Sequence, residues 1–458
     1  MQLQVWCQDA RVGTLSLNDE GRWSFAYDAA WKEFALSPHL PVVAVKADDL
    51  VHQRTVEWFF DNLLPEGMLR ERLEKNQALK KGDSWGLLTW YGKDTAGALS
   101  VLRDGVRPTA KQKFASLSQD TLIHMIDEAR AGNPLMGQDG NPHMSLAGAQ
   151  DKIGLHRQSG LFLIPEGTTP STCILKPENV NKAYPFCPSN EWLCMSLAKR
   201  AGLIVPDVDL ISIGPHRAYV VQRYDRKILD GGYVQRIHQM DLCQAQNVPA
   251  RKKYQDEGGL TAADLFEVAT KCQAPAFANR AAMQWLAFNY LIGNSDAHAK
   301  NVSFLMPDSK PVVAPAYDLL CVEAYHRQNH LTMAIGGESK ATWIEGCHWD
   351  ALALENVLDP RAMRTILTTV TTNLEKVPES LLQSALLLPT EREWLYENVV
   401  PVLMERISLI KDALKSKVGN AITIQDQNKM IPGEILEKIA TQSANKKVTS
   451  PKGNNKDN

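Results

Sequence analysis

Two carboxylates and an amide in the second half of the chain have the spacing that phosphoryl transfer needs. In the run Gly-Asn-Ser-Asp-Ala-His-Ala-Lys-Asn at 293–301, Asp296 precedes Asn301 by five residues, and Asp318 follows after an apolar strand and a turn. A kinase catalytic loop separates its base from its metal-binding asparagine in this way, and a second metal carboxylate follows. The pattern therefore indicates a base beside a Mg²⁺ site. Turn formation, or a helix cap at Asp318, is the alternative.

A lysine and a glutamate upstream extend this pattern. Lys176 ends an apolar run at 173–175, and Glu191 opens a predicted helix at about 190–202. In kinases such a lysine binds the α- and β-phosphates and the glutamate positions it. A lysine at the end of a strand is usually just solvated, but the order Lys, Glu, Asp, Asn, Asp favours a kinase. The loop at 144–152 has one glycine, so it is either a weak phosphate cradle or a hairpin entry.

Composition limits the other possibilities. The chain has 458 residues, 44% of them hydrophobic and 22% charged, and a formal net charge of −2. These values are typical of globular domains and give no overall attraction to nucleic acid or to an anionic membrane. The first residues do not form a secretory signal, and no apolar stretch is long enough for a membrane span. Eight cysteines without a C-x-x-C pair argue against a zinc site or a disulfide framework. We therefore expect a cytoplasmic protein.

The order of predicted elements indicates an α+β, protein-kinase-like bilobal fold. Residues 1–105 read as a β-rich subdomain with helices, and residues 106–235 as a mostly antiparallel ATP-binding lobe. Residues 236–417 read as an all-helical C-terminal lobe that carries the catalytic loop. Residues 418–458 end in a run rich in Lys, Asn and Ser and should be a mostly disordered tail. Helices are predicted at 56–76, from Ser118, and near 190–202, 261–272, 278–292, 350–358, 360–370, 379–387 and 391–415.

Several motifs in this order resemble the HipA family of kinase toxins. They are Ser-Leu-Ala-Gly-Ala-Gln-Asp-Lys (145–152), Ile-Leu-Lys-Pro (174–177), Asn-Glu (190–191), Gln-Arg-Tyr-Asp-Arg (222–226), His-Gln-Met-Asp-Leu-Cys-Gln (238–244), the run at 293–301 and Ala-Tyr-Asp (316–318). The runs at 60–67 and 92–98 resemble the N-terminal subdomain of that family. The resemblance covers about residues 1–415.

The resemblance implies a role for each matching residue. Asp296 matches the catalytic base, Asn301 and Asp318 match the Mg²⁺ ligands, Glu191 matches the structural ion-pair partner, and Ser145 matches a serine that these kinases phosphorylate on themselves. The expected ATP contacts are Ala147, Gly148, Ala149, Gln150, Asp151, Lys152, Lys176, Gln222, Arg223, Tyr224, Gln239, His298, Ala299, Lys300, Asn301, Tyr317 and Asp318. Gln222–Tyr224 would form the hinge beside adenine. The sequence departs from the usual family pattern at Gln222 and around Met240.

The resemblance also implies partners. HipA kinases bind a helix-turn-helix antitoxin, HipB, which supplies the contact with operator DNA, and they phosphorylate a protein substrate; one known kind of target is an aminoacyl-tRNA synthetase. Three rival hypotheses remain: a pseudokinase that acts only by binding, a kinase of a small molecule without a toxin role, and a metal hydrolase that uses His238, Asp296 and His298.

Overall fold

The computed structural model describes residues 1–42, 50–131, 133, 151–307, 310–326 and 329–416. The predictions for Ser145, Ala147, Gly148, Ala149 and Gln150, and for the tail at 418–458, lie outside the described residues. Within the described residues the buried side chains form three clusters, drawn mainly from residues 3–101, 122–220 and 192–410.

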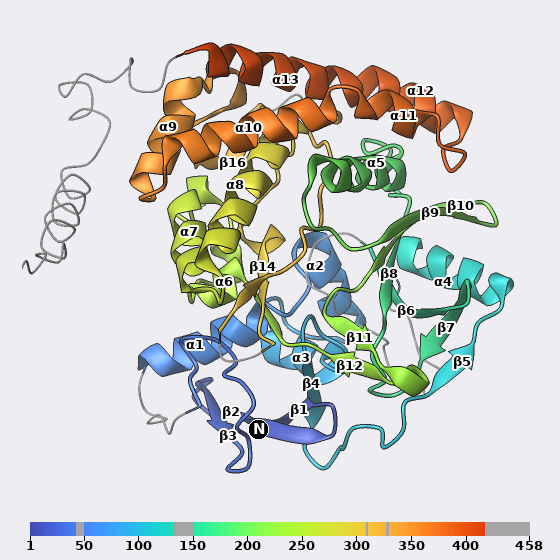
Figure 1. The fold of residues 1–458 in the computed structure, drawn as a ribbon. Coiled ribbons are helices and arrows are strands. Elements are labelled where there is room, and N and C mark those ends of the chain that lie inside the picture. Colours follow the sequence, from blue (N-terminus) through green and yellow to red (C-terminus); the bar gives the residue numbers. More distant parts are fainter. Residues whose placement is uncertain (43–49, 132, 134–150, 308–309, 327–328, 417–458) are drawn as a thin grey trace, which may run out of the picture.

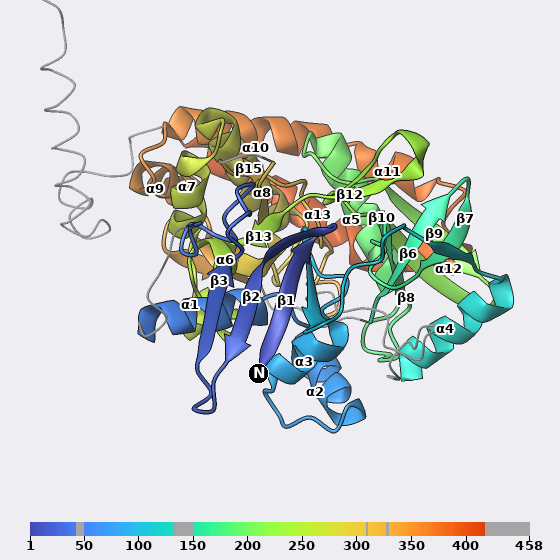
Figure 2. The same cartoon turned by 90° about the horizontal axis from the view of Figure 1, so that it is seen from below.

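The N-terminal subdomain is a four-stranded antiparallel sheet covered by helices. Its strands are β1 (Gln2–Cys7), β2 (Ala10–Leu17), β3 (Trp23–Tyr27) and β4 (Leu99–Arg103), in the order β3-β2-β1-β4. Helices α1 (Leu50–Asp61), α2 (Gly67–Asn76) and α3 (Ser84–Tyr91) follow β3 in the chain. The one helix predicted at 56–76 is wrong: residues 62–66, which include Pro65, separate two helices, and α2 begins at Gly67 with a positive φ of 57°. In Figures 1 and 2 this subdomain lies against the rest of the molecule.

The middle lobe is built on a six-stranded antiparallel sheet, as predicted. Its strands are β5 (Phe114–Ser116), β6 (Ile153–Gln158), β7 (Leu161–Pro165), β8 (Cys173–Pro177), β9 (Val208–Ile213) and β10 (His216–Gln222), in the order β5-β7-β6-β8-β10-β9. Helix α4 (Gln119–Ala131) and helix α5 (Cys187–Ala201) pack on the sheet. A small hairpin follows, made of β11 (Arg226–Ile228), the 3-10 turn η1 (Asp230–Gly232) and β12 (Val234–Arg236).

The alternation of side chains along β10 explains this packing. Ala218 and Val220 are buried against α4, whereas Tyr219 and Val221 belong to the core that contains α5. Successive residues of a strand point to opposite faces, so one strand serves both cores. The N-terminus of α4 is capped by the Ser118 hydroxyl, which accepts a hydrogen bond from the Thr121 amide at 3.1 Å. The helix predicted from Ser118 is thereby confirmed.

The C-terminal lobe is mainly helical but not all-helical. Its helices are α6 (Leu242–Ala245), α7 (Ala262–Lys271), α8 (Pro275–Leu291), α9 (Gly346–Glu355), α10 (Pro360–Leu374), α11 (Val377–Leu382), α12 (Pro389–Asn398) and α13 (Val400–Lys415), with 3-10 turns η2 (Ala250–Lys252), η3 (Gln255–Glu257), η4 (Ala299–Asn301) and η5 (Ala341–Trp343). Two small sheets depart from the prediction of an all-helical lobe, although an apolar strand after Asn301 was expected. They contain β13 (Gln239–Asp241), β14 (Ser303–Leu305) and β15 (Val312–Val313), and β16 (His330–Ile335) and β17 (Glu338–Lys340).

The long helix predicted at 391–415 is two helices. Pro401 stands at the start of α13, where its missing N–H costs no helical hydrogen bond, and the chain bends there. The α+β class is retained, because the strands of the C-terminal lobe are short, and the loop at 293–301 lies between helix α8 and strand β14. Among the described residues no helix is long and apolar enough to cross a membrane.

Candidate active site

A cavity of about 590 Å³ collects residues from all three parts of the chain. The middle lobe contributes Lys176 and Tyr219, the C-terminal lobe contributes Asp296 and Asp318, and the N-terminal subdomain contributes Glu66. This volume is within the range of small-molecule sites. A cavity between the lobes thus exists, and the N-terminal subdomain forms part of its wall.

Strand β8 directs Lys176 into this cavity by simple alternation. Cys173 and Leu175 are buried against α4, while Ile174 and Lys176 line the cavity on the opposite face. The ammonium of Lys176 lies 2.7 Å from Glu191 Oε1 and 2.7 Å from Asp318 Oδ1. We call Lys176, Glu191 and Asp318 the cavity ion cluster.

The electrostatics of the cavity ion cluster favour the charged state of Lys176 and Asp318, whereas burial raises the pKa of Glu191 to about 7. Burial opposes the charge on Lys176, but Asp318 and Glu191 outweigh it and raise the pKa of the ammonium. Burial also opposes ionisation of Asp318, yet the Lys176 ammonium holds the pKa of that carboxyl well below its usual range. Burial and the nearby Lys176 together lower the pKa of Lys152, which also lines the cavity, to about 8. Two lysine side chains, Lys152 and Lys176, therefore lie in the cavity, and lysine is a common ligand of phosphate groups.

The catalytic loop begins where α8 ends. Gly293 adopts a positive φ of 63°, a conformation that favours glycine. The buried Asn294 then accepts a hydrogen bond from the Asp296 amide at 3.2 Å, while its own amide nitrogen donates to Asn289 at 2.7 Å. Asn301 donates from Nδ2 to the Asp296 carbonyl at 3.2 Å. These bonds fix the loop so that Asp296 and Asn301 line the same cavity as Lys176.

Known proteins share this architecture. The HipA N-terminal domain matches residues 3–102 and the HipA-like C-terminal domain matches residues 144–377. The serine/threonine-protein kinase toxin HipA of Shewanella oneidensis is 32% identical over 407 residues, which is 85% of this chain and 90% of that protein. A Sinorhizobium fredii protein, Y4mE, is 34% identical over 83% of this chain and 91% of its own length. The chain belongs to the HipA family.

A solved structure agrees with this membership. The chain of Shewanella oneidensis HipA in its complex with HipB and operator DNA has a TM-score of 0.78 to this chain at 28% identity, covering 91% of this chain and 100% of that one. The predicted family, the kinase-like α+β fold and the enzyme class of serine/threonine-protein kinase are thereby confirmed.

The residues of this HipA-family cavity suit a nucleotide and Mg²⁺. With Nδ2 of Asn301 used as a donor, its amide oxygen is the group left to a cation, and the side chain of Asp318 is 40% exposed. Mg²⁺ prefers such oxygen ligands together with phosphate oxygens. Two buried atoms of cavity-lining residues, Gln239 Oε1 and His298 Nδ1, have no hydrogen-bond partner in the described part of the chain. Such atoms need a partner, and a nucleotide can supply one.

The backbone at Asp318 adds a further sign of function. Asp318 adopts a φ of 57°, in the left-handed region that non-glycine residues rarely occupy. Residues 319–326 contain no helix, only bends and turns at 322–326, so no helix for it to cap starts there. Strained conformations of this kind concentrate at ligand sites.

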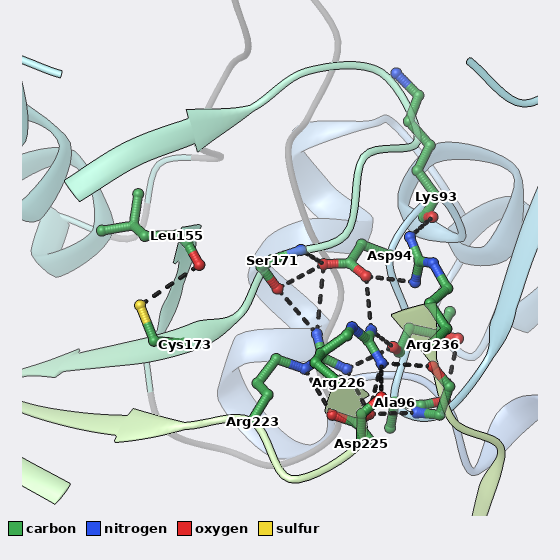
Figure 3. Close-up of polar contacts among 12 residues, drawn as sticks. Lys93, Asp94, Ala96, Leu155, Ser171, Cys173, Arg223, Asp225, Arg226 and Arg236 are labelled. Atoms are coloured by element: carbon green, nitrogen blue, oxygen red, sulfur yellow. Dashed lines mark hydrogen bonds and ion pairs between the residues drawn. The ribbon is translucent and has the colours of Figure 1, made fainter. Parts of the chain in front are cut away.

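In the predicted hinge at residues 222–224, the side chain of Arg223 has partners that the sequence did not indicate. The guanidinium of Arg223 is buried between Asp225, at 2.7 Å, and Asp94 of the N-terminal subdomain, at 3.4 Å (Figure 3). We call Asp94, Arg223, Asp225, Arg226 and Arg236 the hinge ion cluster. The amides of Gln222 and Arg223 donate to the carbonyls of Asp207 and Thr172. A nucleotide contact by Arg223 therefore stays a prediction, one that would have to use its backbone.

The other predicted residues divide into two groups. Most of them line the cavity: Lys152, Lys176, Glu191, Gln222, Arg223, Tyr224, Gln239, Asp296, His298, Lys300, Asn301, Tyr317 and Asp318. Asp151 and Ala299 are not among its lining residues. Asp151 forms an ion pair with Arg72 of α2, and the Ala299 amide donates a hydrogen bond to the Lys253 carbonyl. The Lys300 ammonium is held by Asn62 and Asp241, which makes it a link between the catalytic loop and the N-terminal subdomain.

Sequence reasoning missed several cavity residues. Glu66, Lys253 and Tyr254 line the cavity, and the Tyr254 hydroxyl donates to Asp296 Oδ1 at 2.9 Å. Glu66 lies in the run at 60–67 that resembles the family, which was the available signal. Nothing in the local sequence of Lys253-Tyr254 marks it as part of a site.

The metal hydrolase hypothesis is not supported. His238 is buried against Phe34 with a ring separation of 4.4 Å, and its Nε2 atom lies 2.9 Å from the Leu36 carbonyl. It is therefore engaged with the N-terminal subdomain. Over the residues that the structure describes, no group of three or more His, Cys, Asp or Glu side chains could hold a metal ion.

Proposed function

We propose that this chain transfers the γ-phosphoryl group of Mg-ATP to a serine or threonine hydroxyl of a cytoplasmic protein, as the toxin of a HipBA-type module. The observation that carries the proposal is the bonding of Lys176 to Glu191 and to Asp318 at 2.7 Å each, in the same cavity as Asp296. Kinases use such a lysine to hold phosphates, and a turn-held aspartate to accept the hydroxyl proton.

The step is a single in-line displacement. The acceptor oxygen forms a bond to the γ-phosphorus while the bond from that phosphorus to the β–γ bridging oxygen breaks, and ADP leaves. Asp296 takes the hydroxyl proton, and Lys176 neutralises charge on the phosphates. Asn301 and Asp318 would hold Mg²⁺, which when bound supplies electrostatic stabilisation of the transferring group. A pseudokinase is expected to lack at least one of these catalytic residues, and all of them are present in this sequence.

The test uses γ-labelled ATP, Mg²⁺ and the purified full chain, with and without a bacterial lysate. We expect label on a protein acceptor, and loss of that label for Asp296→Ala and Asp318→Ala. Asp296→Ala should still bind Mg-ATP, whereas Asp318→Ala should bind it more weakly. Asp230→Ala, at an exposed position in η1, is the matched control. Full activity of both site variants would overturn the proposal, and label confined to a small molecule would favour the small-molecule kinase.

The toxin role extends the proposal to the cell. The solved structure that this chain resembles contains HipA, HipB and operator DNA, which supports a HipB-like helix-turn-helix partner through which operator DNA would be contacted. Expression without that partner should arrest growth or produce persisters, and the Asp296→Ala variant should not. Colony counts at matched protein levels decide this; equal growth would remove the toxin role but leave the kinase.

Regulation by self-phosphorylation is the most detailed part of the proposal. Ser145 lies outside the described residues, and its role rests on the family resemblance and on its position seven residues before Lys152. A phosphate there carries about −1.5 to −2 charges and would repel the ATP phosphates. Mass spectrometry after incubation with Mg-ATP should find phosphate on Ser145 in the wild-type chain and none in Asp296→Ala.

A further inference from the structure

The segment between η2 and η3 lies directly on the catalytic loop. The Tyr254 hydroxyl donates to Asp296 Oδ1 at 2.9 Å, and its ring packs edge-on against His298 at 5.2 Å. One residue earlier, the Lys253 carbonyl accepts a hydrogen bond from the Ala299 amide at 3.2 Å. The loop is thus held through the carboxylate that would act as base, through a ring and through its backbone.

The same segment is tied to the N-terminal subdomain. The ammonium of Lys253 lies 2.9 Å from Glu66 Oε2 and 5.0 Å from the centre of the Tyr254 ring. The side chains of Lys253 and Glu66 are only 14% and 15% exposed. Glu66 also lies 3.8 Å from Lys300, whose ammonium donates to the backbone and side-chain oxygens of Asn62. The Glu66 carboxylate of the N-terminal subdomain therefore contacts Lys300 of the catalytic loop and Lys253 of the segment that packs on that loop.

We infer that Tyr254 is a positioning residue for Asp296, and that Glu66 of the N-terminal subdomain holds Tyr254 in place through Lys253. The inference rests on the proposed role of Asp296 as the base. A hydrogen bond to Oδ1 fixes the carboxylate about its last torsion, so that Oδ2 is presented to the acceptor hydroxyl. Proton transfer depends steeply on such geometry. The N-terminal subdomain would then complete the catalytic centre as well as cover it.

The decisive variant is Tyr254→Phe in the full chain, compared with Tyr396→Phe, which removes the hydroxyl of an exposed tyrosine in α12. ADP formation from Mg-ATP is measured over a range of ATP concentrations, with Asp296→Ala as the reference. Loss of one hydrogen bond to a charged group should lower the maximal rate of Tyr254→Phe by roughly 10- to 100-fold. The ATP concentration at half-maximal rate should change by less than about twofold, because Tyr254 acts on the base.

Each other result decides against one specific claim. If Asp296→Ala keeps the wild-type rate, the proposed function fails. If Asp296→Ala is inactive while Tyr254→Phe equals wild type, only this inference fails. A faster Tyr254→Phe would mean that the hydroxyl blocks the acceptor position, and phosphotyrosine at 254 in the wild type would mean that it is an acceptor. A higher half-saturating ATP concentration at an unchanged maximal rate would show a merely structural role.

The link to Glu66 is tested by a double-mutant cycle. Glu66→Gln and Lys253→Met should each lower the maximal rate, and the double variant should be no slower than the slower single one, since both break one contact. Lys253→Arg, which keeps the charge, should restore most of the rate. Melting temperatures identify variants that fail to fold. Independent, additive losses would show that Glu66 does not act through Lys253.

Discussion

The hinge ion cluster and the cavity ion cluster are both groups of paired charges, yet they differ in how far their carboxylates are exposed. In the hinge ion cluster, Asp94 accepts bonds on Oδ1 from Arg226 and Arg236 and on Oδ2 from the Ser171 amide and hydroxyl. Each carboxylate and guanidinium side chain there is at most 8% exposed. In the cavity ion cluster, Asp318 gives one oxygen to Lys176 while 40% of its side chain is exposed.

This difference in exposure distinguishes a cluster that stabilises the fold from a cluster that can bind a ligand. A buried charge whose partners are all protein groups fixes a shape, and here it fixes the hinge onto the N-terminal subdomain (Figure 3). A buried charge that also faces a cavity can exchange a protein partner for a ligand. Burial and ion pairing alone therefore do not identify a site; the accessible oxygen does.

Asp94→Ala should have the largest effect, and it should be on stability. Removing this carboxylate leaves three buried guanidiniums with Asp225 as their remaining acidic partner in the cluster. Breaking a buried ion pair from one side costs about 3–5 kcal/mol of unfolding free energy. Chemical denaturation measures it, with Asp230→Ala as the exposed control. A loss below about 1 kcal/mol would mean that the hinge ion cluster is not a structural lock.

Asp318→Ala should lower activity and leave stability almost unchanged, whereas Asp94→Ala lowers stability. Phosphoryl transfer should fall by about 10²–10³-fold or more, because the proposed Mg²⁺ ligand is lost. Its melting temperature should stay close to that of the wild type, since Lys176 keeps Glu191. Rates and melting curves on the same preparation check both parts. A stability loss as large as that of Asp94→Ala would remove the distinction between the clusters.

The hinge ion cluster should also make the free energy of unfolding depend on pH. Burial opposes the charge of Asp94, but Arg236, Arg223 and Arg226 outweigh it and hold its pKa well below the usual range. A carboxyl whose folded pKa is depressed stabilises the fold above its unfolded pKa, about 3.9, and loses that contribution as pH falls below it. The stability gap between wild type and Asp94→Asn should therefore narrow below about pH 4. Denaturant midpoints at pH 7, 5, 4 and 3.5 measure this, and a constant gap would contradict it.

Glu191→Gln should have a smaller effect within the cavity ion cluster. Lys176 retains Asp318, so the ammonium stays in the cavity but is held on one side only. The maximal rate should fall by roughly tenfold, the value of one charge-assisted bond of about 1.4 kcal/mol. A loss as large as that of Asp318→Ala would show that the two carboxylates are equivalent.

Deletion from Thr441 onward should have the smallest effect. This run is poor in large apolar side chains and lies outside the described residues, so the prediction rests on the sequence. Melting temperature and kinase rate should match those of the full chain. A clear fall in either would show that the tail packs on the molecule.

Local patterns were enough to find the elements that carry the chemistry. The apolar run at 173–175 predicted the strand that carries Lys176, and the context of Asp296 and Asn301 predicted a loop between a helix and a strand, as α8 and β14 now show. The points at which a helix ends and another begins were harder to predict from the sequence. Pro65 and Pro401 interrupt apolar patterns that continue on both sides, so the periodicity read as one helix where two exist.

The sequence by itself determined the order of Lys176, Glu191, Asp296, Asn301 and Asp318 and the kind of chemistry that this order allows. Only the tertiary structure decided which groups surround them. Glu66 and Lys253 are 187 residues apart in the chain, and Tyr254 precedes Asp296 by 42, yet Lys253 contacts the Glu66 carboxylate and Tyr254 contacts the Asp296 carboxylate. Contacts at such separations depend on how whole lobes pack, which no local periodicity encodes. For the same reason Arg223, which the sequence placed beside a nucleotide, has its guanidinium buried with Asp94, 129 residues away.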